Sequence, residues 1–401
     1  MYGLVLEGGG AKGSYHIGVY KALRESGIRI KGIVGTSIGA LNGAMIVQND
    51  YDRCYDLWNK ITYSMVVDVD DDEIDKILQL KLVKEDLSFL RDKIKGLIST
   101  KGFDITPLKK LLDDYIDEEK IRKTGMDFGI VTINLSPFKP LYIFLDDIPK
   151  GELKEYLMAS AYLPIFKSER IGGKLYLDGG FYDNLPFKML VEKGYKDLIL
   201  VRTHAMGFTK KLDLQGINSI IISPSDSIGR SFEYDYNRAR SNIELGYYDA
   251  LRALNGLKGS RYYIIPKKNQ DYYLKFLLNI SEEEVRKMEE ILKLPEVPYR
   301  RSLLEHIVPK ICSIISIDDD CGYEELLIYL LEKKSENLNI ERFKIYTFEE
   351  LVSEVENETI RKEREENSKL DKLIEKVEIL PIINKDEAIL DIADIIFSKG
   401  E

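Results

Sequence analysis

Histidine, cysteine and tryptophan are scarce in this chain, since its 401 residues include only three histidines, three cysteines and one tryptophan. The cysteines Cys54, Cys312 and Cys321 are an odd number and lack the close spacing that is typical of a metal site. This argues against a disulfide framework and favours free thiols in a reducing compartment. We therefore expect neither a metal nor another cofactor.

Long apolar runs and an excess of positive charge are also missing. No uninterrupted apolar stretch reaches the length of a membrane span, and the N-terminus shows no charged region or cleavage site typical of a signal peptide. The net charge of −10 argues against nucleic acid as the main partner and against a purely electrostatic attachment to anionic membranes. We expect a cytoplasmic protein whose contact with membranes is at most peripheral and transient.

The chain has the composition of a globular protein, 44% hydrophobic and 31% charged. Its most informative stretch is residues 30–43, IKGIVGTSIGALNG. This stretch predicts a strand, a sharp turn with Ser37 at its apex, and a helix. Side chains at Gly35 and Gly39 would collide with neighbouring backbone in such a turn. G-x-S-x-G is common by chance, but the flanking strand and helix favour a catalytic serine.

The glycine-rich loop GGGAKG, residues 8–13, follows the first predicted strand and has three interpretations. It is not a phosphate-binding P-loop, because Lys12 precedes Gly13 instead of following it. A dinucleotide fingerprint fits Gly8, Gly10 and Gly13, but the acidic residue expected roughly twenty residues later is missing. The third interpretation is an oxyanion hole built from the backbone N–H groups of Gly8, Gly9 and Gly10. We prefer it because parallel strands bring this loop next to Ser37.

Residues 51–123 read as a polar, helix-rich insertion that carries Trp58, the only tryptophan. The acidic run at 68–73, DVDDDE, lacks the spacing and the glycine of an EF-hand, so we interpret it as a solvated start of a helix. Leucines between residues 78 and 97 predict amphipathic helices, which either cover the active site or pack on the core.

A second candidate catalytic motif lies at the end of a short strand predicted at 175–177. Asp178 follows this strand, and Gly179 and Gly180 leave its carboxylate an open approach. The strand end would hold the carboxylate rigidly, although an ordinary Asp-Gly turn explains the same residues. Further strands are expected at 128–135, 141–145, 197–203, 219–223 and 262–265, and a long helix at 228–254.

Four motifs together are similar to those of the patatin-like phospholipases: GGGAKG, GTSIG, ASAYLPIF and DGGFYDNLP, spread over about 190 residues. The resemblance implies a three-layer α/β/α fold with a nucleophile elbow. It also implies lipid acyl hydrolysis by a Ser–Asp dyad that needs neither histidine nor metal. By motif, Ser37 corresponds to the nucleophile, Asp178 to the base and Gly8 to Gly10 to the oxyanion hole. The supporting motif residues are Lys12, Gly13, Gly35, Gly39, Gly179 and Gly180.

The three histidines, His16, His204 and His306, provide an independent argument for a dyad. The order serine, acid, histidine found in α/β-hydrolases could be completed only by His204 or His306. His306 lies outside the recognisable motifs, and His204 remains an alternative because it follows a predicted strand. We expect each histidine to be structural or exposed.

The sequence changes character near Pro266, beyond which helices rich in lysine and glutamate are expected at 282–292, 323–334, 348–380 and 387–398. We therefore predict a catalytic domain at 1–265 and a mainly helical region at 266–401.

The sequence as a whole predicts a phospholipase A or lysophospholipase type of enzyme acting on membrane phospholipids or lysophospholipids. Three alternatives stay open: a nucleotide-binding module, an idle lipid-binding scaffold, and an acyltransferase.

Overall fold

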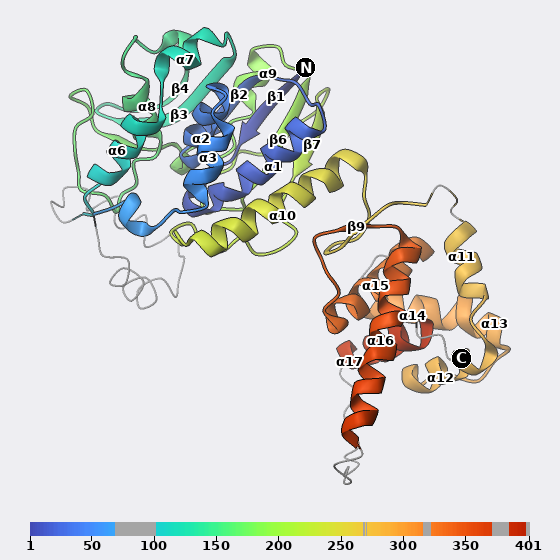
Figure 1. Cartoon of the computed structure of the whole chain (residues 1–401). Coiled ribbons are helices and arrows are strands. Elements are labelled where there is room, and N and C mark those ends of the chain that lie inside the picture. Colours follow the sequence, from blue (N-terminus) through green and yellow to red (C-terminus); the bar gives the residue numbers. More distant parts are fainter. Residues whose placement is uncertain (69–101, 268, 270, 316–321, 371–384, 398–401) are drawn as a thin grey trace. The chain divides into compact units, whose positions relative to one another are not determined.

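The structure is a computed structural model, and it describes residues 1–68, 102–267, 269, 271–315, 322–370 and 385–397. The chain divides into two compact units, Met1–Leu254 and Asn255–Glu401, which we describe separately (Figure 1). Among the described helices, none is both long and apolar enough to cross a membrane.

The first unit is built on a seven-stranded mixed sheet in the order β4-β3-β2-β1-β6-β7, with β5 also pairing with β3. Strands β1, β2, β3, β6 and β7 run parallel, whereas β4 and β5 run antiparallel to β3. Their bounds are Tyr2–Leu6, Ile30–Thr36, Asp127–Leu135, Phe138–Phe144, Tyr176–Asp178, Asp197–Val201 and Asn218–Ile222 for β1 to β7.

Helices cover both faces of this sheet, which confirms the expected three-layer α/β/α fold (Figure 1). On one face α2 (Ile38–Val47) packs on β1, β2 and β3, beside α1 (Ser14–Glu25) and α8 (Leu153–Ser160). On the other face α9 (Lys188–Glu192) packs on an apolar cluster that includes Val5 and Val34. Alternate strand residues thus enter two cores, as a sheet buried on both faces requires.

Strands β2 and β5 share one edge of β3, because β2 is shorter than β3 and leaves the second part of that edge open to β5. The first half of β3 pairs with β2, up to Thr36 opposite Val131. From the next residue onward the same edge of β3 pairs with β5, where Thr132 lies opposite Asp178. The ends of β2 and β5 therefore meet at neighbouring positions along one strand.

The long helix α10 spans Tyr236–Asn255, so the predicted start at residue 228 is wrong. Residues 223–235 are irregular because they are fastened to the glycine loop, with Ala11 N–H donating to Ser231 O at 2.8 Å. This is a tertiary contact, and helical periodicity carries no sign of it.

The insertion at 51–123 contributes three described α-helices, α3 (Tyr51–Trp58), α6 (Thr106–Tyr115) and α7 (Glu118–Lys123), and the short 3-10 helix η2 (Tyr63–Met65). The expected acidic helix start at 68–73 and the leucine-bearing helices at 78–97 lie outside the described residues, apart from Asp68. Of the three cysteines, Cys54 and Cys312 are buried free thiols, and Cys321 is not among the described residues.

The second unit is mainly helical, as expected, and has its own apolar core centred on residues such as Leu331, Phe348 and Ile392. Its helices are α11 (Asp271–Leu278), α12 (Glu282–Leu292), α13 (Tyr299–Ser302), α14 (Val308–Ile314), α15 (Tyr323–Leu338), α16 (Phe348–Leu370) and α17 (Lys385–Phe397). The strand expected at 262–265 is β8 (Tyr263–Ile264), and it pairs with β9 (Ile345–Tyr346) of this same unit.

Candidate active site

Ser37 occupies a strained turn between β2 and α2, with a φ of 54° that side-chain-bearing residues rarely adopt. The glycines on either side are required by the space available. A Cβ on Gly35 would come within 2.3 Å of the Gly39 carbonyl carbon, and a Cβ on Gly39 within 2.3 Å of Leu6 O. The backbone of the turn therefore lies directly against the end of β1, with no room for a side chain at Gly35 or Gly39.

A second serine fastens this turn to the sheet. The Ser37 N–H donates to Ser160 Oγ at 2.9 Å, and the Ser160 hydroxyl donates to Val131 O at 2.6 Å. Ser160 is completely buried at the end of α8. Sequence reasoning missed this role, although a small polar residue in the apolar motif ASAYLPIF was a usable signal.

Asp178, the last residue of β5, is buried, and its carboxylate interacts with the Ser37 hydroxyl. It also accepts the Gly180 N–H at 2.7 Å. Burial raises the pKa of Asp178 to about 6, while the interaction with the Ser37 hydroxyl and the hydrogen bond from the Gly180 N–H oppose that rise. A carboxylate with this pKa is ionised at neutral pH and is still basic enough to accept a proton.

The glycine loop presents two unused backbone donors near the serine. The Gly8 N–H already donates to Asn184 O at 3.1 Å, and the Ala11 N–H is engaged by Ser231 O. Among the described residues, no acceptor is recorded for the N–H groups of Gly9 and Gly10. Of the three N–H groups predicted to donate to an oxyanion, the one of Gly8 is thus already engaged. The N–H groups of Gly9 and Gly10 remain the candidate donors.

A buried carboxylate holds the glycine loop against the end of β6. Glu7, 1% exposed, accepts the N–H groups of Thr203 at 2.6 Å and His204 at 3.0 Å, and pairs with Arg202. The Thr203 hydroxyl donates to Gly8 O at 2.6 Å. Lys12 adds a long hydrogen bond of 3.4 Å to His204 O. Both the lysine and the histidine backbone therefore take part in fixing the loop.

Within the described residues of the first unit, neither histidine side chain hydrogen-bonds to Ser37 or Asp178. The His204 side chain is exposed, and no hydrogen bond from its ring to Ser37 or Asp178 is recorded in the described part of the chain. His16 is buried against Asn42, and burial lowers its pKa to about 3, so the imidazole is neutral. His306 belongs to the second unit.

The remaining motif glycines make room for close packing. A Cβ on Gly13 would come within 2.4 Å of the Ile38 side chain, and one on Gly179 within 2.3 Å of Val131 O. A Cβ on Gly180 would lie 2.8 Å from Asn184 Oδ1. The loop that follows Asp178 can thus lie directly against β3 and the Asn184 amide.

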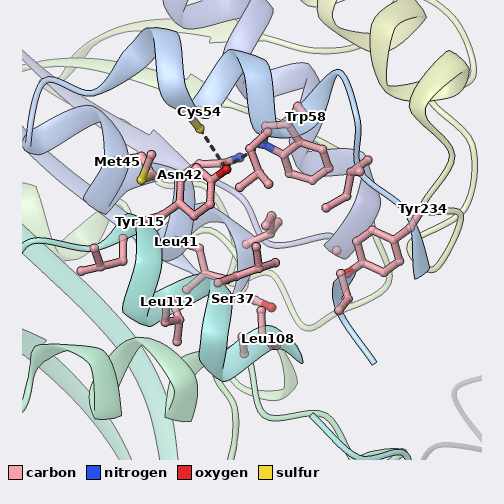
Figure 2. Close-up of a pocket in the computed structure, with 18 of the residues that line it drawn as sticks. Ser37, Leu41, Asn42, Met45, Cys54, Trp58, Leu108, Leu112, Tyr115 and Tyr234 are labelled. Carbon is pink, nitrogen blue, oxygen red and sulfur yellow. Dashed lines mark hydrogen bonds between the residues drawn. The ribbon is translucent and has the colours of Figure 1, made fainter. Parts of the chain in front are cut away.

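A cavity of about 90 Å³ begins at Ser37 and runs between α2, α3 and α6 (Figure 2). Its wall is almost entirely apolar and includes Leu41, Met45, Trp58, Leu108, Leu112 and Phe166. The polar atoms at its α3 side are paired, since the Asn42 carbonyl accepts the Trp58 indole N–H at 3.1 Å. The space is therefore suited to hydrocarbon and not to a charged group.

Part of the first unit is similar in sequence to known proteins. The family model described as patatin-like phospholipase matches residues 4–191. Patatin-like phospholipase domain-containing protein 7 of Rattus norvegicus is 25% identical over 200 residues, 49% of this chain and 13% of that protein. Neuropathy target esterase sws of Drosophila melanogaster is 27% identical over 200 residues, 50% of this chain and 12% of that protein.

The chain thus spans only 12–13% of the length of these curated relatives. Among solved structures, VipD from Legionella pneumophila aligns with 100% of this chain and 92% of its own, at 15% identity and a TM-score of 0.35. A TM-score of this size supports no argument about function.

The pKa of Asp178 predicts that this residue destabilises the fold at neutral pH. Its pKa rises from 3.8 in the unfolded chain to about 6. Between these values the folded state holds a proton that the unfolded state has lost, so stability falls as pH rises and stays lower above pH 6. At about 1.4 kcal/mol per pKa unit, Asp178→Asn should stabilise the protein by up to about 3 kcal/mol at pH 8 and by much less near pH 4.

Urea unfolding at the two pH values measures this difference. Asp127→Asn is the control of opposite sign: although burial alone would raise the pKa of Asp127, hydrogen bonds from Lys193 and Tyr195 hold it below its usual value. That variant should be less stable than the parent at pH 8. A lower stability of Asp178→Asn at pH 8 would contradict the prediction.

Proposed function

We propose that residues 4–191, which form a patatin-like phospholipase domain, make this chain a serine hydrolase that cleaves ester-linked fatty acyl chains from lipids. The observation that carries the proposal is the pairing of two groups: Ser37, which lines an apolar cavity in a strained turn, and the buried Asp178 carboxylate, whose pKa is raised by burial and lowered in part by interaction with the Ser37 hydroxyl. The relatives' names, a phospholipase-domain protein and an esterase, point to the same chemistry.

In the first half-reaction Ser37 Oγ attacks the ester carbonyl carbon while Asp178 accepts the hydroxyl proton. The bond from the carbon to the leaving alcohol then breaks, and the proton passes from Asp178 to that alcohol. In the second half-reaction the same carboxylate takes a proton from water, and the water oxygen attacks the acyl carbon. The bond from that carbon to Ser37 Oγ then breaks, and Asp178 returns the proton to the serine oxygen. The raised pKa of Asp178 suits a group that must both take and return a proton near neutrality.

The negative charge on the carbonyl oxygen would be stabilised by the N–H groups of Gly9 and Gly10. Each well-placed donor of this kind lowers the activation barrier by about 3–4 kcal/mol. The tight packing of the loop also weakens the nucleotide-binding alternative, because a Cβ on Gly10 would lie 2.1 Å from Ser231 O and two neighbouring amides are already engaged. A phosphate would have to displace these contacts.

The cavity beside Ser37 would take the part of the acyl chain next to the scissile carbonyl. Its volume of about 90 Å³ corresponds to about three water molecules, so it holds a few methylene groups. The rest of a fatty acyl chain and the head group would remain outside it. A phospholipid or lysophospholipid presented at a membrane surface, with transient contact, meets this requirement.

The proposal assigns catalysis to the predicted domain at 1–265 and leaves 266–401 as an appendage to it. Every side chain and backbone donor that it uses lies within Met1–Leu254. Transfer of the acyl group to an acceptor other than water would use the same first half-reaction. A lipid-binding scaffold without catalytic activity would use the cavity but neither the Ser37 hydroxyl nor the Asp178 carboxylate.

The proposal predicts that two substitutions remove the activity without changing the fold. Ser37→Ala and Asp178→Asn should each lower hydrolysis of a short soluble ester by at least about 10³-fold, since nucleophile and base act as one unit. Asp183→Asn is the matched control, because Asp183 is equally buried but bonded to Tyr142 and not to Ser37. Hydrolysis that survives Ser37→Ala, with unchanged circular dichroism, would refute the proposal.

A second prediction separates a dyad from a triad. His204→Gln should leave turnover within a few-fold of the parent, because the exposed imidazole makes no recorded hydrogen bond to either partner in the described structure. The assay is the same ester hydrolysis. A loss comparable to that of Asp178→Asn would restore His204 as the base and assign Asp178 an orienting role.

The third prediction concerns pH. Because Asp178 must be ionised to act as the base, kcat/KM should rise about tenfold per pH unit in acid and level off above a midpoint near 6. Imidazoles also titrate in this range, so the profile should be repeated with His204→Gln. An unchanged midpoint assigns the titration to the carboxylate, whereas a midpoint that disappears with the histidine would overturn the assignment.

A further inference from the structure

The irregular segment before α10 closes over the glycine loop and brings a tyrosine to the candidate site. Ser231 O accepts the Ala11 N–H at 2.8 Å and would lie only 2.1 Å from a Cβ on Gly10. Three residues later Tyr234 packs its ring edge-on against Tyr63, with ring centroids 6.0 Å apart at 83°. The tyrosine is therefore positioned both by its backbone and by its ring.

The Tyr234 side chain lines the same cavity as Ser37 and Gly10 (Figure 2). Its hydroxyl oxygen is 3.4 Å from the position that a Cβ on Gly10 would take. In the described structure no hydrogen-bond partner is recorded for this hydroxyl. An O–H donor therefore lies beside one of the two unengaged loop amides, Gly10, without being used by the protein itself.

The electrostatics of the site keep this hydroxyl protonated. Burial raises the pKa of Tyr234, and the negative charge of Asp178 raises it further. A neutral phenol in this environment can donate a hydrogen bond but is a poor proton donor to a leaving group. The proton required by the leaving alcohol is already held by Asp178.

We propose that the Tyr234 hydroxyl is a third donor of the oxyanion hole, beside the N–H groups of Gly9 and Gly10; this inference rests on the proposed hydrolase function. When the bond from Ser37 Oγ to the ester carbon forms, the carbonyl electron pair moves to oxygen and the serine proton moves to Asp178. Tyr234 donates to that oxygen and keeps its own proton. The same oxyanion forms again when water attacks the acyl-enzyme, so Tyr234 assists both half-reactions.

Tyr234 lies outside residues 4–191, the segment that the family model matches. Its position in the chain gave no sign of a catalytic role, because the periodicity of 228–254 reads as helix. The hydroxyl is therefore a feature of the segment that follows the motif-bearing domain, brought to the site by the folding of residues 223–235.

The test replaces the hydroxyl and keeps the ring. Tyr234→Phe should lower kcat for a soluble ester by about 10²-fold, the usual effect of one oxyanion donor, with KM little changed. Tyr236→Phe is the matched control, because this nearby tyrosine is 43% exposed. Thermal unfolding should show both variants folded like the parent, since neither loses ring packing.

Leaving-group dependence distinguishes the oxyanion role from assistance to the alcohol. An aryl ester and an alkyl ester of the same acid should lose kcat by the same factor in Tyr234→Phe. A loss limited to the alkyl ester, a change confined to KM, or activity within threefold of the parent would each overturn the inference. If Ser37→Ala also keeps its activity, the hydrolase function fails; if only Tyr234→Phe does, this inference alone fails.

Discussion

The candidate site depends on the way in which one edge of β3 is shared by two strands. Thr36 at the end of β2 faces Val131, and Asp178 at the end of β5 faces the next residue, Thr132. Neighbouring positions along a strand are about 3.3 Å apart, so the backbone itself brings Ser37 and Asp178 close to one another. The dyad geometry thus follows from strand lengths and register, with little dependence on long side chains.

Several features of the site are unfavourable for stability and are compensated by close packing. Ser37 has a strained φ of 54°, and Asp178 is buried with a raised pKa. The glycines around them remove side chains wherever backbone approaches backbone, while Ser160 and Glu7 provide hydrogen bonds that hold the turn and the loop. This pattern is typical of functional sites, where geometry is maintained at some expense of stability.

Much of the first unit could be predicted because local pattern and tertiary position agree there. The strand at Tyr2–Leu6, the turn at Ser37 and the strand that ends in Asp178 each carry a local signal of apolar residues and glycine. The reversal of β5 along β3 has no such signal, and neither does the engagement of the Gly8 N–H by Asn184. Helical periodicity also gave no sign of Tyr234, because that segment is kept irregular by tertiary contacts such as the hydrogen bond from the Ala11 N–H to Ser231 O. Pairing of β8 with β9 depends on contacts that are distant in sequence, and it was equally hidden.

The most direct test of the account is to label the nucleophilic serine covalently in the intact protein. A lipophilic fluorophosphonate should modify the chain at one serine, and mass spectrometry of the digested protein should locate the adduct on the peptide that contains Ser37. Labelling should disappear in Ser37→Ala and be strongly slowed in Asp178→Asn. An adduct on Ser14 or Ser160, or no adduct on a folded protein, would contradict the account.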